Sequence, residues 1–258
     1  MTKTGYFLQL LAGIILGMSV NLAVSANDGN HVLKVVTEEH VPFNFTEHGK
    51  VTGFSTEVLE IVLKEAGMQG QFQVLPWARA YEVAVNAENV LIYSIYRTSQ
   101  REKFFKWIGP LTSSEWFLYG LRERQFKIET LDDAKKFKIG SVNEDAAEHF
   151  LVGKGFVKGE NLQSSVKFPL LYEKLKLGRL DLIIMSEASA FEIARRAGDD
   201  ANKTIQPVYR IGEHAHQGLY FALSAKSDEA ILQRLRKALE TLKKNGSFEA
   251  MKKKWAVQ

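Results

Sequence analysis

Short apolar runs rich in β-branched residues alternate with amphipathic helical segments along this chain, and this alternation limits its fold more than any other feature. The first three runs, at residues 31–36, 72–75 and 90–95, are predicted strands. Helices are predicted between them, one from Ser55 to Gly67 and one from Pro76 to about Ala87. Strands that alternate with helices form βαβ units and parallel sheets. The sequence therefore predicts an α/β fold.

A second set of the same elements follows residue 110. Its predicted strands lie at 138–142, 166–168 and 180–185, and its predicted helices lie at 144–153, 170–177 and 187–197. Two apolar extended stretches, at 116–121 and 218–224, join this set to the first. Helices at 227–245 and 247–255 end the chain.

Two crossings between two αβ lobes form a double hinge. We therefore assign residues 27–115 to the first part of lobe 1, residues 116–216 to lobe 2, and residues 217–258 to the return segment of lobe 1. Ligands of open α/β sheets bind at the carboxyl ends of the strands, so we expect a binding crevice between the lobes.

The first 26 residues have the pattern of a secretory signal peptide. Lys3 precedes an apolar run over residues 6–24, and Ser25 and Ala26 supply the small residues of a cleavage site. The alternative is an uncleaved membrane anchor, although three polar residues interrupt the run. We expect cleavage after Ala26 and a soluble periplasmic protein. Removal of the peptide would leave 232 of the 258 residues and lower the formal net charge from +4 to +3.

The composition argues against several kinds of site. The chain has no Cys, which excludes disulfides, thiol nucleophiles and a lipid-modified N-terminal Cys. It has no Gly-rich phosphate loop and no Gly-x-Ser-x-Gly motif, although a spatial Ser-His-Asp triad stays open. Of the six His, only His214 and His216 lie close together, so we predict no metal and no other cofactor. Its 34 basic and 30 acidic residues do not require a nucleic-acid partner.

A group of donors lies at the end of the predicted strand 90–95. Ser94 and Tyr96 supply hydroxyls there, and Arg97 and Arg101 supply guanidinium groups four residues apart. Arginine presents a planar fork that matches a carboxylate, so this segment is a candidate carboxylate site. The alternative is a structural arginine that pairs with a surface acid.

A second candidate follows the predicted strand 72–75. Trp77 comes directly after Pro76, and Arg79 follows two residues later. A Trp ring at a strand end can stack on a flat or cationic ligand. The alternative is a core Trp at the start of a helix.

These residues complete a pattern that resembles the bacterial periplasmic solute-binding proteins of the polar amino-acid uptake family. The resemblance covers residues 31–255. Segments 41–45 and 49–58 are similar to the family's opening motif, and segment 98–110 is similar to its motif "T-x-x-R … F-S-x-P". The Gly-Arg-Leu-Asp sequence at 178–181 and the ending at 246–255 resemble two further family motifs.

The resemblance implies two αβ lobes that close on a small solute and present it to an inner-membrane ABC permease. It places Arg101 where the family binds the ligand α-carboxylate, and Ser94 and Tyr96 where backbone or hydroxyl groups contact the ligand. It places His40 and Trp77 where aromatic rings enclose the ligand side chain. We therefore expect a periplasmic, monomeric binding protein.

The chain departs from the family pattern in lobe 2. Ser186, followed by Glu187, stands where amino-acid binders carry an Asp that holds the α-ammonium group. Glu144 and Asp145 stand where the family usually has a Gly-Thr pair. A buried ammonium group needs a charged partner, which Glu187, Glu144 or Asp145 could supply. Arg79 and Arg97 favour anions, so a small organic acid is the second candidate ligand.

Three functions stay open at the level of sequence. The first is a non-catalytic binder of an amino acid or related small carboxylate that serves an ABC transporter. The second is a sensory protein that presents its ligand to a membrane receptor. The third is an enzyme of dehydratase type on the same scaffold, for which Glu187 and His40 are the candidate acid–base residues.

Overall fold

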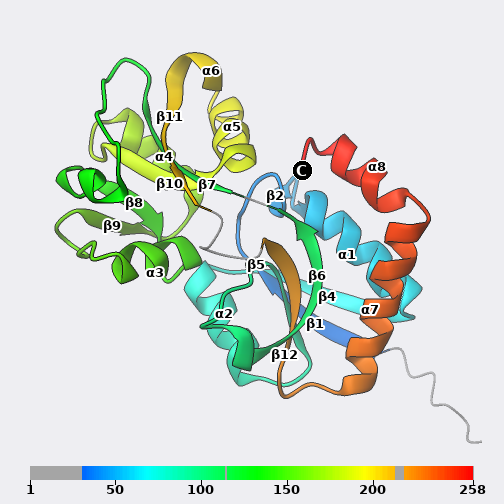
Figure 1. Ribbon diagram of the computed structural model, residues 1–258. Helices are drawn as coiled ribbons and strands as arrows, with labels where there is room; N and C mark the ends of the chain where they lie inside the picture. Colours follow the sequence, from blue (N-terminus) through cyan, green and yellow to red (C-terminus); the bar gives the residue numbers. More distant parts are fainter. Residues whose placement is uncertain (1–30, 114, 213–217, 258) are drawn as a thin grey trace, which may run out of the picture.

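Two lobes, each built on a five-stranded sheet, make up the described part of the protein in this computed structural model (Figure 1). The structure describes residues 31–113, 115–212 and 218–257. The predicted signal peptide, its cleavage site, His214 and His216 lie outside the described residues. Both the α/β class and the two-lobed architecture predicted from the sequence are confirmed.

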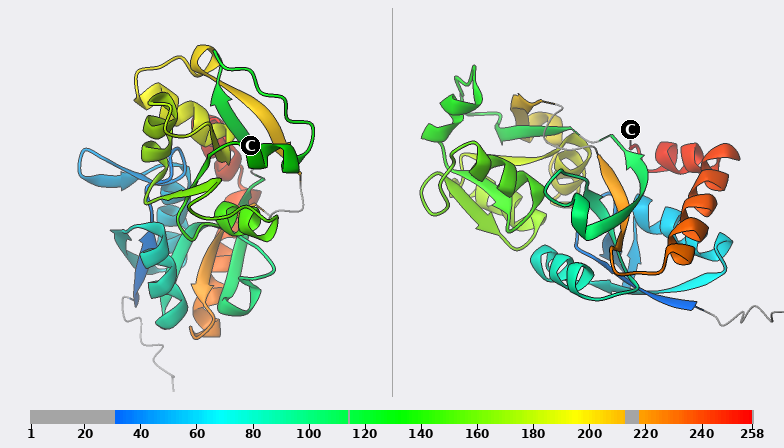
Figure 2. Two further views of the ribbon diagram at one scale, coloured as in Figure 1. Left: turned by 90° about the vertical axis from the view of Figure 1, so that its left-hand side faces the viewer. Right: turned by 60° about the horizontal axis from the view of Figure 1, so that its bottom comes forward.

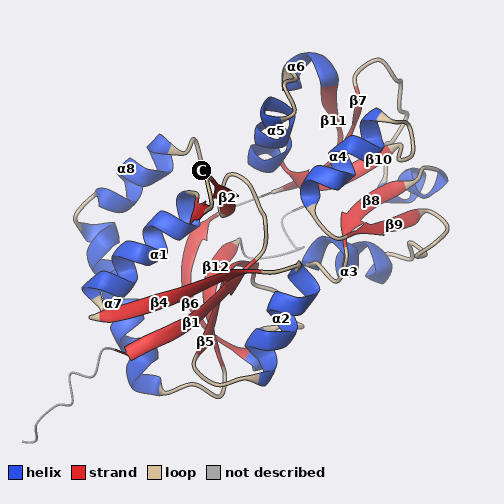
Figure 3. Cartoon of the chain, turned by 180° about the vertical axis from the view of Figure 1, so that it is seen from behind, coloured by secondary structure: helices blue, strands red, loops and turns tan. Residues whose placement is uncertain are grey.

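Lobe 1 contains a sheet of strand order β4-β1-β5-β12-β6. Its strands are β1 (His31–Thr37), β4 (Met68–Val74), β5 (Val90–Tyr96), β6 (Phe105–Thr112) and β12 (Leu219–Ser224). A small hairpin of β2 (Phe45–Glu47) and β3 (Lys50–Thr52) and the 3-10 helix η1 (Glu102–Phe104) are appended. The helices are α1 (Phe54–Glu65), α2 (Trp77–Asn86), α7 (Glu229–Lys244) and α8 (Ser247–Lys254). Helices α1, α7 and α8 pack together, and α2 covers the other face of the sheet (Figure 3).

Lobe 2 has the strand order β11-β7-β10-β8-β9. Its strands are β7 (Trp116–Leu121), β8 (Ile139–Val142), β9 (Leu162–Ser165), β10 (Leu182–Ser186) and β11 (Ile205–Ile211). Its helices are α3 (Ala146–Gly153), α4 (Phe168–Lys176), α5 (Glu187–Arg196) and α6 (Ala201–Thr204), with the 3-10 helix η2 (Leu131–Lys136). The right-hand view of Figure 2 shows the two lobes side by side, and Figure 1 shows α3 of lobe 2 next to α2 of lobe 1.

The central strands explain the continuous apolar runs of the sequence. Every residue of β5, β10 and β12 is buried, because helices cover both faces of each sheet. The helices carry one apolar stripe each; in α7 it includes Leu232, Leu235 and Leu239. Among the described residues, every helix is too short or too polar to cross a bilayer.

The chain passes between the two sheets just before two apolar stretches. Strand β6 of lobe 1 ends at Thr112 and β7 of lobe 2 begins at Trp116, whereas β11 ends at Ile211 and β12 begins at Leu219. The predicted joining stretches 116–121 and 218–224 are therefore strands within the sheets. Strand β12 pairs antiparallel with both β5 and β6, so the sheet of lobe 1 needs chain from both sides of lobe 2.

One predicted strand is wrong. Residues 166–168 were expected to be extended, but β9 lies at Leu162–Ser165 and α4 already begins at Phe168. Pro169 in the first turn favours the helix there, since its fixed φ suits that position. Strand β9 is a polar edge strand that pairs with β8, and it therefore lacks the apolar pattern of a buried strand.

Candidate functional site

The ends of the parallel strands bring the polar groups of the two lobes together. Glu38 and His40 follow β1, Trp77 follows β4 and Arg101 follows β5, all in lobe 1. Asp145 follows β8 in lobe 2. Carboxyl ends of parallel strands share one edge of a sheet, which is why residues far apart in sequence meet here. We call Glu38, Arg101 and Asp145 the interlobe charge cluster.

Arg101 is the only cation of this cluster, and it is buried, with 3% of its surface exposed. Its Nη1 donates to the carbonyl of Tyr96 at 3.1 Å, and its guanidinium carbon lies 4.9 Å from the Trp77 ring centroid and 5.2 Å from that of Tyr81. Burial lowers the pKa of Arg101, and Asp145 opposes that shift. Its Nη2 has no hydrogen-bond partner among the described residues, so the guanidinium group has a free donor.

The two carboxyl groups of the cluster are buried as well. Burial raises the pKa of Glu38 well above its ordinary value, Asp145 adds to the shift, and Arg101 opposes it. Burial likewise raises the pKa of Asp145, against the opposing charge of Arg101. Asp145 caps α3 through the amide of Ala146, whereas Oε2 of Glu38 has no partner among the described residues. The cluster therefore holds two acids against one base.

His40 contacts lobe 2 directly. Its Nε2 lies 3.1 Å from the hydroxyl of Ser189, and its ring stacks on Phe168 with centroids 4.6 Å apart. Burial lowers the pKa of His40 to about 3, so the ring is neutral at ordinary pH. Its Nδ1 has no partner within the described chain. His40 therefore leaves one nitrogen, Nδ1, without a hydrogen-bond partner among the described residues at the junction of the lobes.

Trp77 also bridges the lobes. Its Nε1 donates to the backbone carbonyl of Glu144 at 2.8 Å, while its ring lies against Arg101. The indole thus packs on the guanidinium group of its own lobe and bonds to the loop after β8 in the other lobe. The same ring that the sequence predicts as a ligand contact also joins the two lobes.

Ser94 and Tyr96 lie in β5 on the lobe 1 side. Ser94 is buried with φ of +56°, and its hydroxyl has no hydrogen-bond partner among the described residues. The ring of Tyr96 packs edge-on against Trp116 of lobe 2 with centroids 4.9 Å apart. A residue other than glycine in the left-handed region is strained, and such positions gather at functional sites.

The structure does not bring Arg79, Arg97 or the Glu144 carboxylate into the cluster. Arg79 pairs with Glu82 on the exposed side of α2 at 2.6 Å. Arg97 pairs with Glu102 at 2.6 Å, and its guanidinium carbon lies 5.5 Å from the Trp107 ring centroid. The Glu144 carboxylate binds His149 and Lys158 of its own lobe, each at 3.0 Å.

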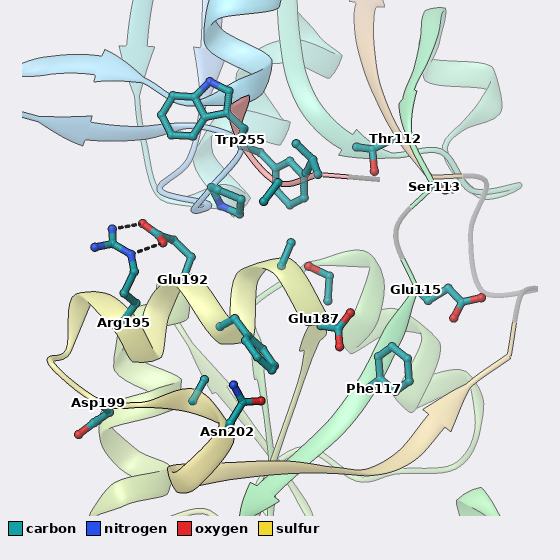
Figure 4. A pocket seen from close by; sticks show the side chains of 18 of the residues that line it. Thr112, Ser113, Glu115, Phe117, Glu187, Glu192, Arg195, Asp199, Asn202 and Trp255 are labelled. Atoms are coloured by element: carbon teal, nitrogen blue, oxygen red, sulfur yellow. Dashed lines mark hydrogen bonds and ion pairs between the residues drawn. The ribbon is translucent and has the colours of Figure 1, made fainter. Parts of the chain in front are cut away.

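Ser186 and Glu187 lie where β10 meets α5. The Ser186 hydroxyl donates to that of Ser189 at 3.0 Å, so Ser186 reaches His40 through one intermediate group. Glu187 and Ser186 both line a cavity of about 930 Å³ beside the first connection between the lobes (Figure 4). Phe117, Phe191 and Trp255 line the same cavity. Of the four acidic or hydroxyl candidates in lobe 2, only Asp145 belongs to the charge cluster.

Sequence reasoning missed Glu38, Tyr81, Phe168 and Ser189. Glu38 lies two residues after the predicted strand 31–36 and directly after β1, and that position was the available signal for it. Tyr81 and Phe168 look like core residues of α2 and α4, and Ser189 is a small residue within α5. Their contacts cross long sequence separations, 149 residues between His40 and Ser189, and no local pattern reports them. Among the described residues, no three His, Asp or Glu side chains are placed to hold a metal ion.

Comparison with known proteins places this geometry in a family. The L-cystine-binding protein TcyJ of Escherichia coli K12 is 22% identical over 254 residues, which is 95% of this chain and 92% of that protein. The arginine-binding extracellular protein ArtP of Bacillus subtilis 168 is 21% identical over 259 residues, which is 96% and 97% of the two chains.

Solved structures share the fold. A histidine kinase sensor domain with similarity to periplasmic binding proteins superposes with a TM-score of 0.77 at 20% identity, over 88% of this chain and 96% of that chain. An ancestral arginine-binding protein bound to arginine gives 0.75 at 21% identity, over 87% and 97%. Residues 33–258 match the model of the bacterial extracellular solute-binding proteins, family 3. The family resemblance seen in the sequence is thereby confirmed, and the chain belongs to family 3 of the bacterial extracellular solute-binding proteins.

Proposed function

We propose that this chain is the periplasmic substrate-binding component of an ABC transporter. In this proposal it closes two lobes on a free amino acid and delivers that amino acid to a membrane permease. The signal peptide 1–26, the lobe boundaries given above, a monomeric state and the absence of catalysis are parts of the same proposal. Curated relatives named as cystine-binding and arginine-binding proteins support it.

The observation that carries the proposal is the pair of unpartnered atoms in the interlobe charge cluster. Buried polar groups normally have partners, and a buried charge without one is costly. Arg101 Nη2 is a free donor for a carboxylate, and Glu38 Oε2 is a free acceptor for an ammonium group. A zwitterion carries both groups, so an amino acid would complete both at once.

The balance of charge supports an amino acid over a simple organic acid. Glu38 and Asp145 face a single guanidinium group, and burial raises the pKa of both acids. A ligand that brought only a carboxylate would add a third acid to this site. A ligand that also brought an ammonium group would offset the excess.

Native mass spectrometry of the purified protein tests the proposal. The expected result is a fraction of protein whose added mass equals that of one amino acid, recovered chemically unchanged after release. A chemically altered product would instead support the dehydratase-type enzyme. A bound carboxylate without an amino group would identify the ligand as an organic acid instead of an amino acid.

A sensory role is the second candidate function. The histidine kinase sensor domain that shares this fold is the observation that favours it. The two roles differ in what the closed protein contacts. Crosslinking of the ligand-loaded protein in its native membrane should capture a permease under the main proposal and a receptor under the alternative.

A further inference from the structure

A contact outside the charge cluster ties the end of α5 in lobe 2 to the β2 strand of lobe 1. Arg196 is the last residue of α5, and its Nη2 lies 3.0 Å from Oε1 of Glu47 in β2. Its guanidinium carbon lies 4.0 Å from the ring centroid of Phe45, which is itself buried. A cation thus contacts a carboxylate and an aromatic face of the opposite lobe together.

Arg196 is oriented for this contact by its own helix. Its Nε bonds to Oε1 of Glu192 at 2.7 Å, one turn earlier in α5, which leaves Nη2 for Glu47. Hydrogen bonds from Arg195 and Arg196 lower the pKa of Glu192, so this carboxylate stays ionised. Arg195 pairs with the same Glu192 at 2.7 Å, and the charge of Glu47 in lobe 1 acts on it only weakly.

Helix α5 connects this contact to His40 of lobe 1. Ser189 in its first turn contacts His40, and Arg196 at its end contacts Glu47. Seven residues separate the two, which is about 10 Å along a helix. The helix therefore meets lobe 1 at two places, one in the cleft and one away from it.

We propose that Arg196 is a positioning residue that holds the lobes closed, and that with Glu47 and Phe45 it sets ligand affinity from outside the cleft. The contact joins groups on different lobes, so it is made only when the lobes are together. A contact present only in the closed state raises the closed population, and apparent affinity follows that population. This inference does not depend on which ligand the cluster binds.

The test compares Arg196→Ala with Arg195→Ala in ligand-free protein. The chain contains no Cys, so Glu88→Cys in lobe 1 and Glu160→Cys in lobe 2 provide two unique labelling positions. Pulsed electron paramagnetic resonance then reports the distance between the lobes. We expect the open-to-closed ratio to rise about three- to tenfold in Arg196→Ala, from the loss of one partly exposed ion pair and one cation–π contact. Arg195→Ala should change this ratio much less, because the ion pair with Glu47 is made by Arg196 and Arg195 feels only the charge of Glu47.

Two further variants separate positioning from general destabilisation. Arg196→Lys keeps a cation near Glu47 and should recover part of the closed population, while Glu47→Gln combined with Arg196→Ala should add little to either change alone. High salt should open the parent and leave Arg196→Ala unchanged, since the pair is partly exposed. Identical distance distributions in the parent and Arg196→Ala would overturn the inference. Failure to find a bound amino acid would bear on the proposed function and leave this measurement unaffected.

Discussion

At the scale of single residues, the site is defined by charge that has been removed from water. Arg101, Glu38 and Asp145 are almost fully buried; Arg101 and Asp145 influence the pKa of Glu38, and Arg101 influences that of Asp145. Such a group is stable only when its members are paired, and the free atoms on Arg101 and Glu38 show which pairs are incomplete. The residue-scale predictions therefore concern these groups and the neutral His40 beside them.

Replacing Arg101 by Met should abolish stabilisation by an amino acid. The substitution removes the free Nη2 donor, and loss of one partner of a buried charge pair typically costs about 2–5 kcal/mol of binding. A thermal-shift screen of the free amino acids checks this. Arg97→Met is the matched control, because Arg97 pairs with Glu102 away from the cluster. Equal shifts in Arg101→Met and wild type would remove Arg101 from the site.

Replacing Glu38 by Gln should stabilise the ligand-free protein at pH 8 relative to wild type. Burial raises the pKa of Glu38 in the folded protein. The contribution of Glu38 to stability is therefore complete below the ordinary glutamate pKa and is lost as pH rises through the raised native pKa. Gln stays neutral throughout. Urea unfolding at pH 5 and pH 8 measures the difference, with the exposed Glu65→Gln as control. The difference in unfolding free energy between wild type and Glu38→Gln should change between pH 5 and pH 8. An equal difference at both pH values would contradict this prediction.

Replacing His40 by Gln should flatten the acid limb of the stability profile. The native pKa of His40 is lowered from 6.5 to about 3, so the unfolded chain takes up a proton first. Its contribution is complete above pH 6.5 and is lost as pH falls towards 3, at about 1.4 kcal/mol per pH unit. Unfolding free energies between pH 4 and pH 7 give the slope. The exposed His48→Gln should retain the wild-type slope, and a retained slope in His40→Gln would refute the assignment.

At the scale of elements, β5 is the strand that builds the site. All of its residues are buried, it lies next to β12 at the centre of the sheet, and it carries Ser94 and Tyr96 before the segment that ends in Arg101. The pairing of β12 with β5 shifts register near Tyr93, next to Ser94 with its positive φ. The backbone of β5 is therefore irregular near its carboxyl end, just before the segment that leads to Arg101.

Replacing Ser94 by Gly should raise the free energy of unfolding by about 1 kcal/mol. Glycine adopts positive φ without the penalty of a Cβ, and the change also removes a buried hydroxyl that has no partner. Chemical denaturation measures the gain. Ser94→Ala separates the two causes, because it removes the hydroxyl and retains the strain. A less stable Ser94→Gly would mean that the serine is held there by favourable contacts.

The elements that the sequence predicts well are those with a regular apolar pattern. Strands β5, β10 and β12 are apolar throughout, and α7 carries a clear stripe, so their positions follow from burial alone. Strand β6 was not predicted, because Gly109 and Pro110 lie inside it and interrupt its pattern. Strands β2 and β3 have three residues each, too few for any periodicity.

The same distinction applies to the site. Arg101 and Trp77 were predicted because they follow strand ends, and the structure places both where the lobes meet. Ser189 reaches His40 only through the position of lobe 2 against lobe 1, and that position is not encoded in any local pattern. Glu38 had a local signal in its place after a strand end, but no motif marked it. Arg79 and Arg97 have guanidinium groups that could bind a carboxylate, but each forms an ion pair with a glutamate close to it in the sequence, Glu82 and Glu102 respectively.

At the scale of the whole molecule, the candidate site is assembled by contacts between the two lobes. Contacts from Trp77 to the Glu144 carbonyl and from His40 to Ser189 and Phe168 cross between lobes, and Arg196 adds another with Glu47. Each lobe alone holds only part of the charge cluster, with Asp145 on one side and Glu38 and Arg101 on the other. Under the proposed function, ligand affinity depends on both the cluster and the free energy of closing the lobes.

The measurement that tests the central claim most directly is a thermal-shift comparison of an amino acid with its two single-group analogues. The most stabilising of the free amino acids, L-cystine included, is compared with its deaminated acid and its decarboxylated amine. At about 100 times its dissociation constant, the amino acid should raise the melting temperature by roughly 5–10 °C. We predict little or no stabilisation by either analogue, since each leaves Arg101 or Glu38 unpaired. Equal stabilisation by the deaminated acid would contradict the claim that the cluster recognises a zwitterion.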